Sequence, residues 1–292
     1  MTASRLILSI ALLSTCSRVF GQSTSLSEER SLQLKQIFHD VAAGYEITEG
    51  SGGELKQLPL RDEPIMHWLS LDGTEGTYLG SVFTWTRLQR PEVVGTIFTS
   101  DGTKEQIAVC EELYSFSSEQ LQLRSGRGTL WRPAPGENMR RIPDAPIPSE
   151  SQQGRRLQIR NMSRQFSGRM NRRGEPHPLR LLPRPIYQYE SDDPNILSGA
   201  LLVLVAYNTD PDILLLIEAR QTAEGPRWFF QPARFSDKSL WLTFKESDIW
   251  ISLRLGHGSD KPHADDLQYH VEFVTLDVPL KSEKDASETK PQ

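Results

Sequence analysis

The stretch GALLVLVAYNTDPDILLLIEA, from Gly199 to Ala219, contains two apolar runs separated by a polar turn. The residues between the runs are Asn, Thr, Asp and Pro, which favour turns. Each run is far shorter than the about 20 apolar residues of a membrane-spanning helix. The stretch therefore predicts a β-hairpin that is buried on both faces. A five-residue turn has too few ligands for calcium, so we expect Asp210 and Asp212 to shape a type I turn.

The first 21 residues have the layout of a secretory signal peptide. Arg5 precedes an apolar core at residues 6–13, and Gly21 is a small residue before Gln22. We expect cleavage after Gly21 and export to the periplasm or beyond the cell. Two alternatives stay open. The segment is a helix of the fold, or Cys16 is a lipid anchor, because residues 13–16 approximate a lipobox.

The composition is that of a globular protein, with 37% apolar residues and six tryptophans among 292 residues. Loss of Arg5 and Arg18 with the leader changes the formal net charge from −5 to −7. This acidic excess argues against a wholly nucleic-acid-binding protein. Cys110 becomes the one cysteine of the mature chain, and we expect a buried thiol because no histidine is near it in sequence.

Two amphipathic segments, at residues 26–43 and 152–170, each precede a series of short apolar or alternating runs that predict antiparallel strands. Similar residues recur in the same order about 120 positions apart. For example, Gly80 and Phe116-Ser117 correspond to Gly199 and Phe235-Ser236. The alternative is that all meanders share such residues. We favour an α+β fold in which two tandem helix-plus-antiparallel-β-meander repeats pack as a pseudo-symmetric pair.

This interpretation divides the chain into five parts. They are a signal peptide (1–21), a first repeat (22–132), a proline-rich linker (133–150), a second repeat (151–276) and a disordered tail (277–292).

Arginine is concentrated between residues 152 and 184, where nine arginines accompany a single acid, Glu175. Arg156, Arg160 and Arg164 are spaced i, i+4 and i+8, which places them along one face of the second helix. This face is a candidate site for an anionic polymer or a lipid headgroup. Nucleic acid is disfavoured because Phe166 is the only aromatic residue among these arginines. The alternative is a face that is solvated or paired with acidic residues.

Three histidines near the C-terminus, His257, His263 and His270, are weak candidates for a metal site, with aspartates between them. Their spacing matches no tight metal-binding template, and a solvated loop is favoured. Motifs for a nucleophile elbow, a phosphate-binding loop, a dinucleotide fold and a redox pair are missing from the sequence. We therefore expect no cofactor.

The runs LRLLPRPIYQYE (Leu179–Glu190) and GALLVLVAYNTDPDILLLIEAR (Gly199–Arg220) resemble those of a family of exported bacterial proteins with no assigned activity. The resemblance implies secretion and a shared fold. It transfers no catalytic residue.

We expect an exported, non-enzymatic binding or structural protein of the periplasm or envelope. One alternative is a hydrolase with a cleft of carboxylates or histidines between the two repeats. Another is a lipid carrier, which requires an internal cavity. A polar cleft with close carboxylates favours the hydrolase, whereas a dry interface favours the binding or structural protein.

Overall fold

The computed structural model describes residues 27–50, 55–72, 76–100, 107–136, 139–253 and 268–276. It is mostly β, with 53% strand and 13% helix. The signal peptide with Cys16, the C-terminal tail, His257 and His263 lie outside these ranges. Within the described ranges there are two helices and three antiparallel sheets. The predicted α+β fold of two helix-plus-meander repeats is therefore wrong.

The first half forms two of the sheets. Its elements are α1 (Glu28–Ala43), β1 (Glu46–Glu49), β2 (Lys56–Gln57), β3 (Met66–Asp72), β4 (Gly76–Arg87), β5 (Arg90–Ser100), β6 (Ile107–Ser115), β7 (Leu121–Ser125) and β8 (Gly128–Trp131). One sheet has the order β2-β1-β7-β8. The other has the order β18-β6-β5-β4-β3 and takes its edge strand β18 (Tyr269–Leu276) from the end of the chain.

The second half forms a single sheet with the order β17-β16-β10-β11-β13-β14-β15-β9, in which β12 also pairs with β13. Its elements are β9 (Arg140–Arg141), α2 (Gln152–Ser163), β10 (Phe166–Arg172), β11 (Glu175–Leu181), β12 (Tyr187–Tyr189), β13 (Ile196–Val205), β14 (Ile213–Arg220), β15 (Arg227–Arg234), β16 (Leu240–Phe244) and β17 (Ser247–Ser252). Strand β9 lies in the stretch predicted to be a linker and pairs with β15.

Three differences explain why the repeat prediction is wrong. The first half splits its strands between two sheets, whereas the second half forms one. Strand β18, predicted in the second repeat, pairs with β6 and so covers what would be an exposed edge. The second helix ends at Ser163, and the rest of the predicted helix is β10. Met162, Phe166 and Met170 are spaced like a helix stripe, but residues 166, 168 and 170 also fit the period of a strand.

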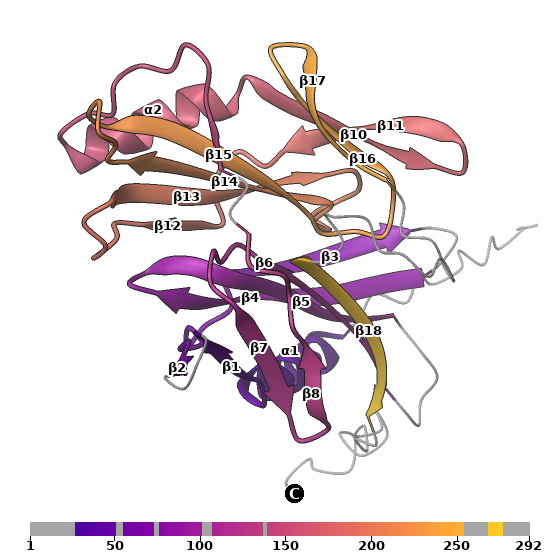
Figure 1. The fold of residues 1–292 in the computed structure, drawn as a ribbon. Coiled ribbons are helices and arrows are strands. Elements are labelled where there is room, and N and C mark those ends of the chain that lie inside the picture. Colours follow the sequence, from indigo (N-terminus) through magenta and orange to yellow (C-terminus); the bar gives the residue numbers. More distant parts are fainter. Residues whose placement is uncertain are drawn as a thin grey trace, which may run out of the picture.

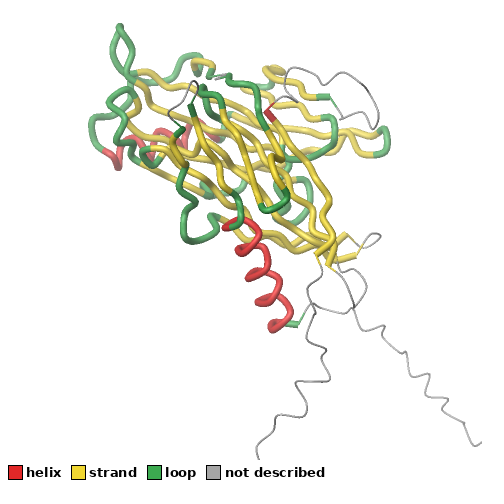
Figure 2. Tube along the Cα trace, turned by 60° about the horizontal axis from the view of Figure 1, so that its bottom comes forward, coloured by secondary structure: helices red, strands yellow, loops and turns green. Residues whose placement is uncertain are grey.

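The layers are stacked, with the second-half sheet above the five-stranded sheet in Figure 1. Both helices lie on the outside of the strand layers (Figure 2). Helix α1 packs Leu34 and Phe38 against the outer face of the five-stranded sheet. It begins after the N-cap Ser27, whose side chain accepts a hydrogen bond from the Arg30 amide.

Strands β13 and β14 form the predicted central hairpin, and its burial on both faces is confirmed. Leu202 and Leu215 belong to a core with α2 and the outer strands of the same sheet. Leu201 and Leu216 belong to a core shared with Val82 and other residues of the five-stranded sheet. Because successive side chains of a strand point to opposite faces of the sheet, the hairpin contributes to both cores.

The turn of this hairpin is shaped by Asp212, whose Oδ2 accepts a hydrogen bond from the Ala206 amide at 2.7 Å. The Asp210 amide donates to the Tyr207 carbonyl at 3.2 Å. Asn208 between them has a φ of 46°. The predicted type I turn is therefore wrong, because that turn needs a negative φ at this position.

Gly80 on β4 allows the indole ring of Trp68 to lie directly on the backbone of the neighbouring strand. A Cβ atom at Gly80 would stand 2.2 Å from the ring. The Trp68 Nε1–H donates to Thr96 Oγ1 at 2.9 Å, so the ring cannot move without losing this bond. We expect Gly80→Ala to destabilise the fold by about 1–3 kcal/mol through this overlap. Urea unfolding measures the change, with Gly126→Ala as the control because no atom lies within 4 Å of the added Cβ. Equal stability of the two variants would contradict the prediction.

Candidate functional site: an acidic pocket between the sheets

A cavity of about 540 Å³ opens between the two halves beside the turn of the central hairpin. Strands of the five-stranded sheet supply Trp68, Phe98 and Glu112 to its wall. The hairpin turn supplies Asp210 and Asp212. Arg172 at the end of β10 and Arg173 in the β10–β11 turn also line the cavity. The β15–β16 loop completes the lining with Asp237 and Lys238.

Three carboxyl groups in this cavity come from both halves of the chain. Glu112 Oε1 accepts a hydrogen bond from the Tyr269 hydroxyl at 2.8 Å, and Asp212 accepts its bond from the Ala206 amide. Among the described residues, no ion pair joins Glu112, Asp210 or Asp212 to a basic side chain. The nearby Lys238 ammonium contacts the Asp237 carboxylate at 2.5 Å. Lys238 contacts none of the three directly, but its charge lowers the pKa of each and so offsets part of their negative charge.

Burial governs the titration of this cluster. It raises the pKa of Glu112 to about 8, although the Tyr269 hydroxyl favours the ionised form. It raises the pKa of Asp212 to about 7, although the hydrogen bond from the Ala206 amide favours the ionised form. Burial and the negative charges of Asp212 and Glu112 also raise the pKa of Asp210 well above its ordinary value. Each group resists ionisation because burial and the acidic neighbours outweigh the positive charge of Lys238.

Aromatic rings form much of the remaining wall. They belong to Trp68, Tyr78, Phe98, Tyr207 and Phe235. The Arg172 guanidinium lies 4.8 Å from the centre of the Tyr207 ring, so this wall already holds one cation over an aromatic face.

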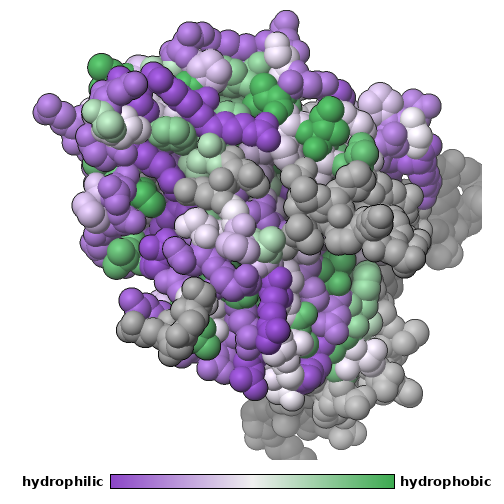
Figure 3. Space-filling view, in the orientation of Figure 1, coloured by the Kyte–Doolittle hydropathy of each residue, from purple (hydrophilic) through white to green (hydrophobic). Residues whose placement is uncertain are grey.

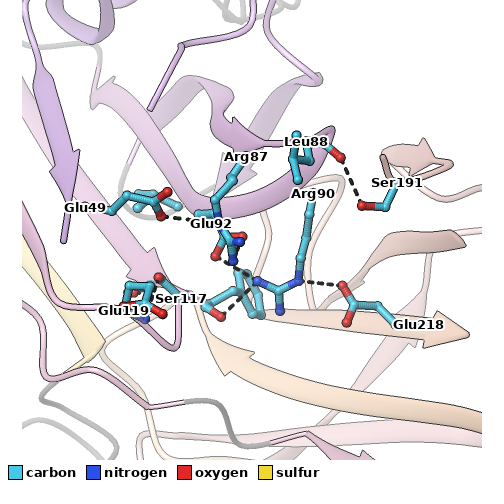
Figure 4. Close-up of polar contacts among 12 residues, drawn as sticks. Glu49, Arg87, Leu88, Arg90, Glu92, Ser117, Glu119, Ser191 and Glu218 are labelled. Carbon is cyan, nitrogen blue, oxygen red and sulfur yellow. Dashed lines mark hydrogen bonds and ion pairs between the residues drawn. The ribbon is translucent and has the colours of Figure 1, made fainter. Parts of the chain in front are cut away.

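A second buried charge cluster between the halves has a different character, because its carboxylates are paired (Figure 4). Arg90 donates to Glu218 and to Glu92, each at 2.8 Å, and to the Phe116 carbonyl at 3.2 Å. Arg87 approaches Glu92 at 3.1 Å and Glu49 at 3.4 Å.

Glu218 also accepts hydrogen bonds from Tyr189 and Arg220. Burial acts to raise its pKa, but the two guanidinium groups and the hydroxyl outweigh burial and lower it. Contacts of the β4–β5 turn join the same interface, where the Leu88 carbonyl accepts from the Ser191 hydroxyl at 3.0 Å. A buried charge that only supports the fold is paired in this way, and the cavity carboxyls are not.

The arginines predicted as an anion site are exposed at or just beyond α2. Arg156 and Arg160 line a groove of about 890 Å³ together with Arg184, which lies outside the helix. Arg164 caps the C-terminus of α2 and does not line the groove. Two of the three predicted residues are therefore brought together, and Arg184 is added.

Of the three candidate histidines, only His270 lies in the described part of the chain. His270 on β18 stacks on the Trp131 ring, with 6.1 Å between ring centres. Its Nε2 is 3.7 Å from Glu272, and burial lowers its pKa. No cluster of three potential metal ligands occurs in the described ranges. Cys110 is buried as predicted, and burial raises the pKa of its thiol.

Sequence reasoning did not identify the acidic pocket. From the sequence, Asp210 and Asp212 have only the role of shaping a turn, and Glu112 has none, although it lies in the run that forms strand β6. A usable signal was present in that strand, because Glu111 and Glu112 interrupt an apolar run. Glu111 is explained by its two hydrogen bonds from Arg127 at 3.0 and 3.1 Å. Glu112 has no such partner and is thus the residue that needed another explanation.

Comparison with family models, curated proteins and solved structures finds no match to this chain. Neither helix of the described residues is long and apolar enough to span a membrane. The surface seen from the side of Figure 1 is mainly hydrophilic, and its hydrophobic residues lie in separate small groups (Figure 3).

Proposed function

We propose that this chain is an exported binding protein that holds a small cationic ligand, an organic amine, in the acidic pocket. The observation that carries the proposal is the convergence of Glu112, Asp210 and Asp212 on one cavity without a direct ion pair to a basic side chain among the described residues. Uncompensated buried charge is costly. A ligand ammonium group supplies the missing charge and compensates that cost.

The walls and the size of the pocket suit the same ligand class. Aromatic faces such as Tyr207 attract a cation. A volume of about 540 Å³ is within the range of small-molecule sites. An acyl chain is a poor fit because the cavity wall carries carboxyl groups, which disfavours the lipid-carrier alternative at this site.

Isothermal titration with 1,4-diaminobutane tests the proposal. We expect binding about tenfold tighter at pH 8.5 than at pH 6, because the carboxyl groups of Glu112 and Asp212 ionise in between. The double variant Glu112→Gln, Asp212→Asn is expected to lose at least tenfold in affinity. Asp248→Asn is the matched control, because this exposed carboxylate pairs with Arg169 on another strand. Equal affinity of all three proteins, or no binding by the parent, would contradict the proposal.

A hydrolase remains the second candidate, because pKa values of about 7 and 8 suit a general acid near neutral pH. It is less favoured, since acid and base partners usually have pKa values pushed apart, whereas all three carboxyl groups here shift upward. Hydrolysis of nitrophenyl esters or glycosides that disappears in Glu112→Gln would favour this candidate.

A further inference from the structure

The groove beside α2 carries a positive charge that nothing else in the described structure uses. Arg156 and Arg160 project from the helix, and Arg184 comes from the segment between β11 and β12. All three side chains are exposed. No ion pair to any of them occurs within the described residues, and no acidic residue lines the groove.

Neighbouring arginines show what a structural arginine looks like in this segment. Arg155 is buried and donates to Ser198, to the carbonyls before α2 and to Glu190. Arg169 forms a two-point contact with Asp248 at 2.7 and 2.8 Å. Arginines with a structural role in this segment thus have protein partners for their guanidinium groups. Arg156, Arg160 and Arg184 form no ion pair within the described residues, so their guanidinium groups remain available to bind an anion.

The groove also has an apolar component. Leu157 is 56% exposed and lies in the groove wall beside Arg156 and Arg160. Pro183, Pro185 and the buried Leu202 add further apolar surface. None of the described residues that line the groove is aromatic, so a stacking site for nucleic-acid bases is disfavoured.

We propose that this groove binds the phosphate headgroup of an anionic lipid and so docks the α2 side of the protein on a membrane surface. Guanidinium groups hold phosphate oxygens in pairs of hydrogen bonds. Leu157 and the two prolines contact the glycerol and the first part of the acyl chains. A basic helix face with an exposed leucine has the chemistry of interfacial binding. This site is separate from the acidic pocket and does not depend on the amine proposal.

Vesicle flotation tests the site with the full chain. We expect binding to equimolar phosphatidylglycerol and phosphatidylcholine vesicles at 0.1 M salt, and none to pure phosphatidylcholine. Each of Arg156→Gln, Arg160→Gln and Arg184→Gln is expected to weaken binding about fivefold. Arg164→Gln is the matched control, with the same charge change at a residue outside the groove. Equal losses for Arg164→Gln and Arg160→Gln would overturn the groove as the site.

Leu157→Asn separates a lipid from a soluble polyanion. The variant is expected to lose at least threefold in vesicle binding while retention on heparin stays unchanged, because heparin has no apolar chain. All of these side chains are exposed, and unchanged thermal melting confirms that each variant folds. Parent protein that binds heparin or inorganic phosphate but not the anionic vesicles would overturn the proposal.

Discussion

Replacing Arg90 by methionine is expected to lower the free energy of unfolding by about 3–5 kcal/mol. The Arg90 side chain is 3% exposed, and it is the contact shared by Glu92 and Glu218, both fully buried. Methionine fills similar space but removes one of the three guanidinium groups that compensate Glu49, Glu92 and Glu218, so that Glu92 keeps only Arg87 and Glu218 only Arg220. The loss therefore comes mainly from uncompensated buried charge, and not from an empty volume. Urea unfolding at pH 7 measures it.

Two further variants isolate this cause. Adding Glu92→Gln to Arg90→Met removes the one excess negative charge, and we expect recovery of a large part of the loss. Arg87→Met is the milder comparison, because the Arg87 side chain is 32% exposed and contacts Glu92 and Glu49 from the edge of the cluster. A loss below about 1 kcal/mol for Arg90→Met would show that water reaches the cluster and that the interface tolerates free carboxylates.

The position of Arg90 explains why this effect extends beyond one strand. Its contacts join strand β5 of the first half to Glu218 on β14 of the second half. The turn before it has positive φ at both Leu88 and Gln89, as tight hairpins require. The Gln89 carbonyl then accepts a hydrogen bond from the Tyr187 hydroxyl at 2.9 Å. Loss of Arg90 should therefore weaken the contact between the two halves.

Local structure was predicted well where the pattern of apolar residues fitted only one kind of element. The central hairpin has apolar residues at nearly every position, and that pattern fixed both its strands and its burial. Residues 166–170 failed because apolar residues at 162, 166 and 170 satisfy a helix and a strand alike. Backbone pairing with β16 selected the strand. Such a choice depends on a partner about 75 residues away, which a local pattern does not contain.

The pairing and stacking of the sheets depend on contacts between residues that are still farther apart in the sequence. Tyr269 on β18 reaches Glu112 on β6 across 157 residues. No turn signal indicates this pairing, so β18 was placed with its sequence neighbours. The same limit hid the acidic pocket, because Glu112 meets Asp210 and Asp212 only when the two sheets stack. It hid Arg184 as well, since this residue joins Arg156 and Arg160 through tertiary structure.

The stability of the protein is expected to fall as pH rises through the range set by the pocket carboxyls. Glu112 has an ordinary pKa of 4.5 in the unfolded chain and about 8 in the folded protein. Between these values the folded state binds more protons than the unfolded state, so the free energy of unfolding decreases with pH. Asp212, with a folded pKa of about 7, contributes the same sign over a lower range.

Glu112→Gln is the variant that isolates this effect. Glutamine keeps an oxygen that accepts the hydrogen bond from the Tyr269 hydroxyl, but it does not ionise. We expect the variant and the parent to differ little near pH 4.5. At pH 8.5 the variant is expected to be more stable by up to about 5 kcal/mol, the upper limit set by the pKa difference.

Urea unfolding at several pH values between 4.5 and 8.5 measures the divergence of the two stability curves. The stability curve of Asp248→Asn should be parallel to that of the parent in the upper half of this pH range. The contact with Arg169 lowers the pKa of Asp248, so this carboxyl group is ionised throughout that half. Parallel curves for Glu112→Gln and the parent would mean that Glu112 ionises without cost in the folded state. In that case the pocket already contains a compensating cation or water, and the argument for a cationic ligand loses its physical basis.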